Sequence, residues 1–63
     1  MTTAVEVPPN EARIYWREKG KGTPYWEMAR VHTYVKDHGI LVLRVRLGRV
    51  LCVDLSAIEW RMA

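Results

Sequence analysis

Arginine is the most abundant side chain in this sequence that is suited to binding an anion. Seven of the ten cationic residues are arginines, and seven acids leave a formal net charge of +3. A guanidinium group makes forked hydrogen bonds to phosphate and stacks on flat rings. Several of the arginines alternate with tyrosine, tryptophan or histidine, over residues 13–17 and again over residues 30–34. This combination predicts an anionic partner.

The main candidate surface is the outward face of a predicted hairpin over residues 28–53. Cations and one aromatic residue share that face: Arg30, His32, Tyr34, Arg44 and Arg46. Such a face fits backbone phosphates and offers a stacking surface for exposed bases. Arg13 and Arg17 extend it from the preceding strand, and Lys19 and Lys21 alternate with glycines in a loop that a phosphate can approach. We therefore expect a module that binds nucleic acid, DNA rather than RNA, with little sequence preference.

A second interpretation is a protein–protein interaction module of the kind that docks on a host protein. Aromatic residues beside a long first loop form grooves for proline-rich peptides or modified lysines in small β domains. Here those residues would be Tyr15, Tyr25 and Trp26. A homo-oligomer is compatible with either interpretation, because Val42, Val50 and Cys52 would leave an apolar strip on the outer face.

Catalysis has little support in the sequence, so we do not expect an enzyme. The acids are scattered without a pair, and Ser56 has no acid or histidine at a suggestive spacing. Cys52, His32 and His38 lack the spacing of a metal site, and no cofactor motif is present. We expect Cys52 to be buried and inert on a strand. A lone cysteine, the lack of a long apolar stretch and the lack of a signal peptide predict a soluble cytoplasmic protein with no membrane partner.

The elements that must position these residues are short. Residues 1–10 contain Pro8-Pro9 and predict a flexible N-terminal leader, and residues 11–63 form a single domain. Alternation of apolar and polar residues predicts strands over 13–17, 40–47, 50–53 and 58–61, with a glycine-containing loop over 18–24. Ser56 and Glu59 could instead form a capping box for a final helical turn.

Residues 24–38 admit two interpretations. Thr23 as N-cap, Pro24 at the first helical position and Gly39 just past the end would suit a helix. β-Branched residues at every second position favour a strand over 28–36 instead. With Asp37-His38-Gly39 as a three-residue hairpin loop, Val35 would face Leu41, and Arg30, His32 and Tyr34 would face Arg46, Arg44 and Val42. That agreement favours the strand.

The predicted fold is therefore all-β, a small five-stranded SH3-like barrel. The alternative is an α+β domain with one helix at about 24–38 on a three-stranded antiparallel sheet. Residues 12–61 also resemble the C-terminal SH3-like domain of retroviral integrases, through Arg13-x-Tyr15-x-Arg17, Trp26-x-x-Ala29-x-Val31 and Gly39-x-Leu41-Val42-Leu43. In that family a Gly-Pro usually follows the tryptophan, where this chain has Glu27-Met28. The resemblance implies the same fold and binding of DNA.

Overall fold

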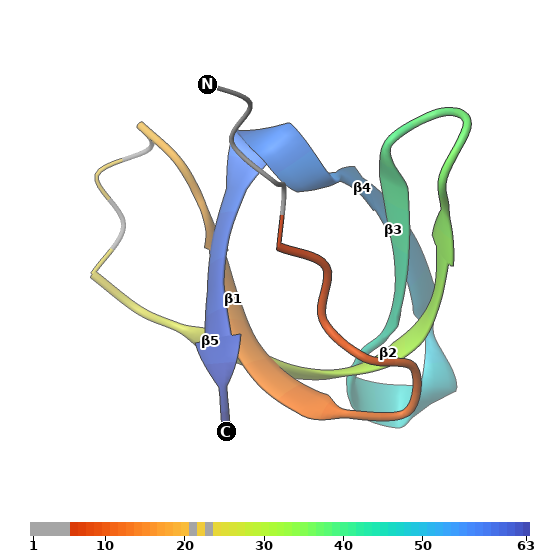
Figure 1. Cartoon of the computed structure of the whole chain (residues 1–63). Helices are drawn as coiled ribbons and strands as arrows, with labels where there is room; N and C mark the ends of the chain where they lie inside the picture. Colours follow the sequence, from red (N-terminus) through yellow and green to blue (C-terminus); the bar gives the residue numbers. More distant parts are fainter. Residues whose placement is uncertain (1–5, 21, 23) are drawn as a thin grey trace.

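The computed structural model describes residues 6–20, 22 and 24–63. Its elements are five strands and two 3₁₀ turns: β1 (Arg13–Glu18), β2 (Glu27–Val35), β3 (Ile40–Arg44), η1 (Arg46–Gly48), β4 (Val50–Asp54), η2 (Leu55–Ala57) and β5 (Ile58–Met62). All neighbouring strands are antiparallel, in one sheet of order β4-β3-β2-β1-β5 (Figure 1). The prediction of an all-β, five-stranded domain is confirmed. The alternative helix over 24–38 is wrong, because β2 occupies most of that segment.

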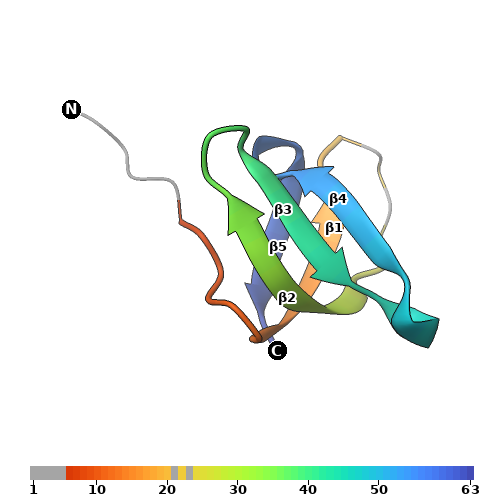
Figure 2. The ribbon, with the colours of Figure 1, turned by 90° about the vertical axis from the view of Figure 1, so that its right-hand side faces the viewer.

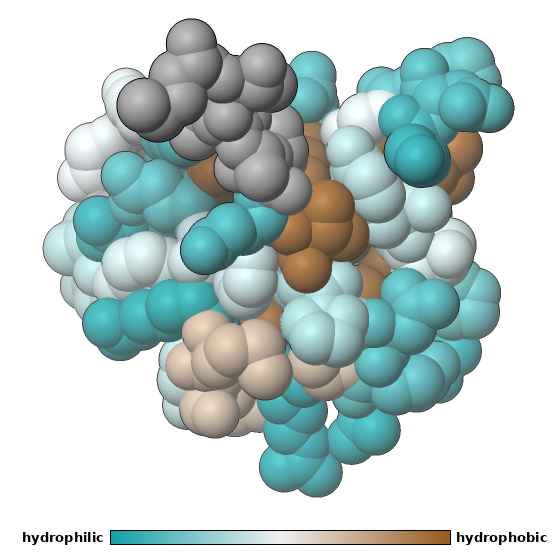
Figure 3. Space-filling model, viewed as in Figure 1, coloured by the Kyte–Doolittle hydropathy of each residue, from teal (hydrophilic) through white to brown (hydrophobic). Residues whose placement is uncertain are grey.

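The sheet is strongly curled, so that one face surrounds the core and the other faces solvent (Figures 1 and 2). Among the described residues, β4 and β5 are the two edge strands of the sheet. The buried core consists of Ile14, Trp16, Ala29, Val31, Leu41, Leu43, Leu55 and Ile58. Along β1, the first half of β2 and β3, these buried residues alternate with more exposed ones, as a sheet with one buried face requires. Figure 3 shows a small hydrophobic area surrounded by a largely hydrophilic surface.

Residues 6–12 run beside the curled sheet before β1 begins (Figure 1). The sequence assigns residues up to 10 to a flexible leader. Within this segment the Pro8 side chain is fully buried. The chain then joins β2 by two backbone hydrogen bonds. The Glu11 N–H donates to the Val31 carbonyl at 2.7 Å, and the Val31 N–H donates to the Ala12 carbonyl at 2.9 Å. These bonds position the start of β1 beside the middle of β2.

The β2–β3 hairpin has a different register from the predicted one. Its loop comprises Lys36 to Gly39, so that Val35 pairs with Ile40 and not with Leu41. A bulge between Val31 and Thr33 then shifts the pairing again, leaving Val31 opposite Leu43. An extra residue in one strand reverses which residues face the core beyond it.

The bulge overturns the predicted facing of the second half of β2. Ala29 and Val31 face the core before it, and Tyr34 packs against the core after it. The prediction that Tyr34 lies on the basic outer face is therefore wrong. Val35 is exposed at the end of the strand.

Strand β3 is shorter than the alternation over 40–47 predicts. It ends at Arg44, and the Val45 N–H donates to the Arg49 carbonyl at 2.8 Å to close a tight turn that contains η1. Leu47 (φ 66°) and Gly48 (φ 74°) both adopt the left-handed conformation there. Arg46 therefore lies in a turn, so the prediction that it lies opposite Arg30 on a strand is wrong.

The last strand is reached through η2. The Asp54 carboxylate caps this turn by accepting hydrogen bonds from the Ser56 N–H (2.9 Å) and the Ser56 Oγ–H (2.7 Å). Glu59 lies within β5, so a capping box that starts a helix at Ser56 does not form. The strand places Trp60 beside the core and returns the chain to β1.

Candidate nucleic-acid interface

Three arginines form a row across the outer face of β1, β2 and β3. Arg13 is the cross-strand partner of Arg30, and Arg30 is in turn the partner of Arg44. The residues beside them in sequence, Ile14, Val31 and Leu43, are completely buried, so the arginines lie on the opposite, solvent-facing side. Because directly opposed residues have Cβ atoms only about 5 Å apart, like charges at these positions repel one another.

This row forms one side of an open groove whose other side comes from the η1 turn. Residues from β1, β2, β3, η1 and β4 line it: Arg13, Glu27, Met28, Ala29, Arg30, Arg44, Val45, Arg46, Gly48, Arg49 and Leu51. Five of these are arginines and one is an acid. Within the described residues, none of the five has a carboxylate within 4 Å, since the ion pair found there joins Arg17 to Glu59. We call this surface the arginine groove and define it by Arg13, Arg30, Arg44, Arg46 and Arg49.

His32 extends the arginine groove toward the β2 bulge. It is exposed, and its Nδ1 atom lies 3.3 Å from Nη2 of Arg44. A guanidinium group can only donate, so this ring nitrogen accepts the hydrogen bond. The sequence predicts that His32 and Arg44 are neighbours, and the structure places them so through the bulge, although Arg30 and not His32 is the partner of Arg44 in the ladder.

Arg17 belongs to a second cluster on the same outer face, together with Arg61 of β5. Its Nε atom donates to Oε2 of Glu59 at 2.7 Å, and its guanidinium lies 4.3 Å from the centroid of the Trp26 ring. The Arg61 guanidinium lies 4.5 Å from the same centroid and 5.8 Å from that of Tyr15. The charge of these two arginines is engaged within the molecule.

The aromatic residues of the alternative interface are therefore partly covered. Tyr15 and Trp26 are half-buried and have arginine side chains over their rings, whereas Tyr25 is 76% exposed. A proline-rich peptide or a modified lysine would have to displace Arg17 or Arg61 to stack on Trp26. Arg61 links the rings of Tyr15 and Trp26, and the most accessible of the three rings is that of Tyr25.

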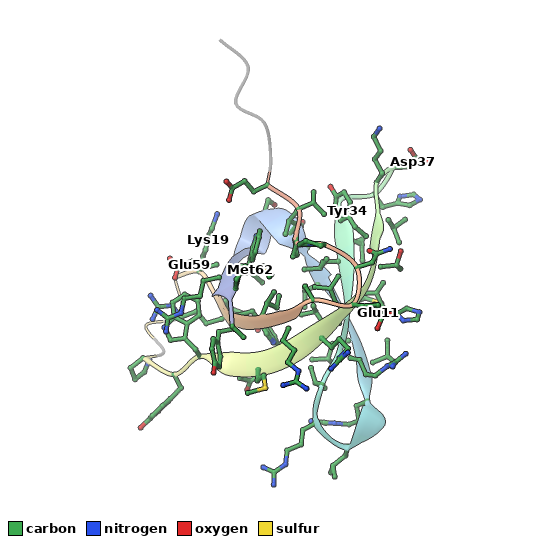
Figure 4. All side chains as sticks on the ribbon, turned by 60° about the horizontal axis from the view of Figure 1, so that its bottom comes forward. Glu11, Lys19, Tyr34, Asp37, Glu59 and Met62 are labelled. Carbon is green, nitrogen blue, oxygen red and sulfur yellow. The ribbon has the colours of Figure 1, made fainter. Side chains whose placement is uncertain are left out.

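The remaining predicted cations lie outside the arginine groove. Lys19 is exposed, on a different side of the molecule from the η1 turn (Figure 4). Its backbone N–H donates to the Ala57 carbonyl at 3.0 Å. Lys21 lies outside the described residues. Lys19 therefore lies on a different surface from the arginine groove.

Sequence reasoning missed Arg49 and Arg61. Arg49 lies in the gap between the predicted strands over 40–47 and 50–53, and the turn that closes back on β3 brings it into the same groove as Arg44. Arg61 is the cross-strand partner of Tyr15. The alternation Glu59-Trp60-Arg61 on a final strand was a signal for that pairing, but the strand order was needed to identify β1 as its neighbour.

Cys52 lies in the middle of β4, opposite Val42. The prediction that it is buried is wrong, because its side chain is exposed. It points outward with Val50, which is 55% exposed, whereas Leu51 and Val53 pack against the core. The apolar strip of Val42, Val50 and Cys52 therefore exists at the end of the sheet formed by β4.

No helix in the described part of the chain has the length and apolar character needed to cross a membrane. The described residues also contain no group of three His, Cys, Asp or Glu side chains that could hold a metal ion. The chain matches no family model, no curated protein and no solved structure.

Proposed function

We propose that this protein binds nucleic acid, DNA in preference to RNA, by holding backbone phosphates in the arginine groove. The single observation that carries the proposal is the row of Arg13, Arg30 and Arg44 on adjacent strands. Three cations opposed in this way destabilise a sheet unless an anion lies between or over them. Arg46 and Arg49 add two more guanidinium groups on the facing side of the groove.

The chemistry of the arginine groove suits a chain of phosphate groups. Guanidinium groups bind phosphate oxygens through two parallel hydrogen bonds, and successive arginines can engage successive phosphates. Contacts of this kind fix the position of the nucleic acid but carry no sequence information. The resemblance of residues 12–61 to integrase C-terminal domains points in the same direction, toward DNA.

A salt titration of binding tests the proposal. Fluorescence anisotropy would measure the affinity for labelled duplex DNA, single-stranded DNA and RNA of mixed sequences. With three to five phosphate contacts, the logarithm of the binding constant should fall against the logarithm of salt concentration with a slope of roughly −3 to −4.5 for duplex DNA. Absence of binding at low salt, or a flat response, would contradict the proposal.

Variants identify the surface. Arg44→Gln and Arg46→Gln should each weaken binding by a similar factor on every sequence and reduce the magnitude of the salt slope by about one. Lys36→Gln is the matched control, because it removes the same charge from the exposed hairpin loop at the other end of β2. If Lys36→Gln weakens binding as much as Arg44→Gln, net charge and not the arginine groove is responsible.

A further inference from the structure

Leu47 is the most exposed large hydrophobic residue in the described part of the chain, with 89% of its surface accessible. It is also one of the few residues other than glycine with a positive φ, at 66°. In this conformation the Cβ atom of an L residue approaches the backbone carbonyl, so glycine or asparagine is expected there. Neither packing nor backbone preference accounts for a leucine at this position.

The backbone presents Leu47 at the tip of a projecting turn. Leu47 and Gly48 are consecutive left-handed residues, and the turn is closed behind them by the hydrogen bond from Val45 to Arg49. No residue of η1 is buried. Figure 2 shows this turn extending beyond the ends of β3 and β4, away from the rest of the sheet. The side chain is therefore accessible to a large partner without any rearrangement of the core.

The surroundings of Leu47 are cationic. Arg46 precedes it and Arg49 follows two residues later, and both line the arginine groove. An apolar anchor for a protein partner normally lies in a well-packed apolar pocket, whereas here Arg46 and Arg49 flank the turn and the next exposed apolar residue in the chain is Val50. Proteins that bend DNA use the opposite arrangement, with one apolar side chain inserted between stacked bases and cations on the flanking phosphates.

We infer that Leu47 is a wedge that enters a base step of duplex DNA while Arg46 and Arg49 hold the phosphates on either side. This inference rests on the proposed function and adds a substrate class to it, a duplex that can be unstacked and bent. Insertion transfers an exposed leucine from water into the stack of bases, and this gain offsets the cost of unstacking one step. Flexible pyrimidine–purine steps are the preferred sites.

The test compares bending and affinity in variants that keep the fold. Leu47→Gly and Leu47→Asn both suit a left-handed residue, so each should melt no lower than the parent protein. Leu47→Met retains an apolar side chain of similar size. Val35→Thr is the control. It replaces an exposed apolar side chain at the far end of β2 with a polar one of nearly the same shape. The probes are a short duplex labelled at both ends for energy transfer, and the same duplex with 2-aminopurine at a central TA step.

At saturation the parent protein and Leu47→Met should shorten the end-to-end distance and increase the 2-aminopurine fluorescence. Leu47→Gly and Leu47→Asn should lose both signals, while their affinity falls by less than about tenfold, because the gain of insertion is largely offset by unstacking. Val35→Thr should behave like the parent.

Two results would overturn the inference, and they differ from failure of the proposed function. If the parent binds duplex DNA with a steep salt dependence but leaves it straight and stacked, Leu47 is not a wedge and the phosphate contacts stand. The same holds if Leu47→Gly bends the duplex as strongly as the parent. If the parent shows no binding to duplex at low salt, the proposed function fails and the inference fails with it.

Discussion

Arg30 of β2 and Arg44 of β3 occupy directly opposed positions in the sheet, on the face that is exposed to solvent. An antiparallel ladder usually stabilises such positions with opposite charges or with paired β-branched and aromatic residues. Here a third arginine, Arg13, continues the row on the other side of Arg30. In the absence of an anion, we therefore expect the protein to be less stable than a variant with neutral residues at these three positions.

Replacing the central arginine of the row should stabilise the free protein. Arg30→Gln removes the residue that is opposed to two like charges, and we expect the melting temperature at low salt to rise by about 3 °C. In 1 M salt, screening should abolish most of the difference. Circular dichroism melts of both proteins at the two salt concentrations measure the effect. A decrease in melting temperature at low salt would show that Arg30 is held by favourable contacts.

Arg17 should behave in the opposite way to the arginines of the groove. Arg17→Gln breaks the ion pair with Glu59 and the contact with the Trp26 ring, so the free energy of unfolding should fall by about 1 kcal/mol. DNA affinity should be nearly unchanged, because the charge of Arg17 is already engaged. Urea denaturation and anisotropy on the same preparations separate the two effects. A large loss of affinity with unchanged stability would place Arg17 in the interface.

Gly39 is required by the hairpin loop. Its φ is 64°, and a Cβ atom added there would meet nothing within 4 Å, so the cost of a side chain is that of the backbone conformation alone. Gly39→Ala should lower the free energy of unfolding by about 1 kcal/mol, which is about 4–8 °C for a domain of this size. Gly39→Asn should lose less, since asparagine tolerates the left-handed region. Equal losses in the two variants would point to a steric cause.

Asp54 should make stability depend on pH in acid. The hydrogen bond from the Ser56 hydroxyl, followed by that from its backbone N–H, lowers the pKa of Asp54 below the ordinary value of 3.8. A lowered pKa in the folded state means that the stabilisation is present above pH 3.8 and disappears as the pH falls through the folded value. Asp54→Ala should melt below the parent at neutral pH, and the difference should narrow in strong acid. If the difference in melting temperature between the two proteins does not change with pH, the charge of the Asp54 cap is not its cause.

The fold class and the central hairpin could be predicted because their signals are local. Alternation of apolar and polar residues identifies β1 and β3, and Gly39 marks the turn between β2 and β3. The bulge near His32 carries no such signal, because one extra residue in a strand leaves the composition unchanged. Its position depends on how Tyr34 and Leu41 pack together in the finished sheet, and that contact decides which side chains reach the solvent.

Most of the arginines of the arginine groove could be predicted from the sequence, but their arrangement and the presence of Arg49 could not. Four of its five arginines were named from the alternation of β1 and of the hairpin, while the strand register assigned Arg44 the wrong partner. The pattern Val45-Arg46-Leu47 continues the alternation of β3, so the sequence gives no warning that the strand ends at Arg44. The end of the strand is set by the left-handed pair Leu47 and Gly48, which turns the chain and brings Arg49 into the groove.

The bulge in β2 also determines which changes of length the protein can accept during evolution. Arg30 and Tyr34 are four residues apart and would share one side of a regular strand, yet the first faces solvent and the second faces the core. Deleting His32 would leave Arg30 and Tyr34 three positions apart, on opposite sides of a regular strand, so each would keep the side it occupies now. Related sequences should therefore either keep the bulge or lack one residue between positions 29 and 34, whereas one additional residue there would reverse the side on which Arg30 or Tyr34 lies.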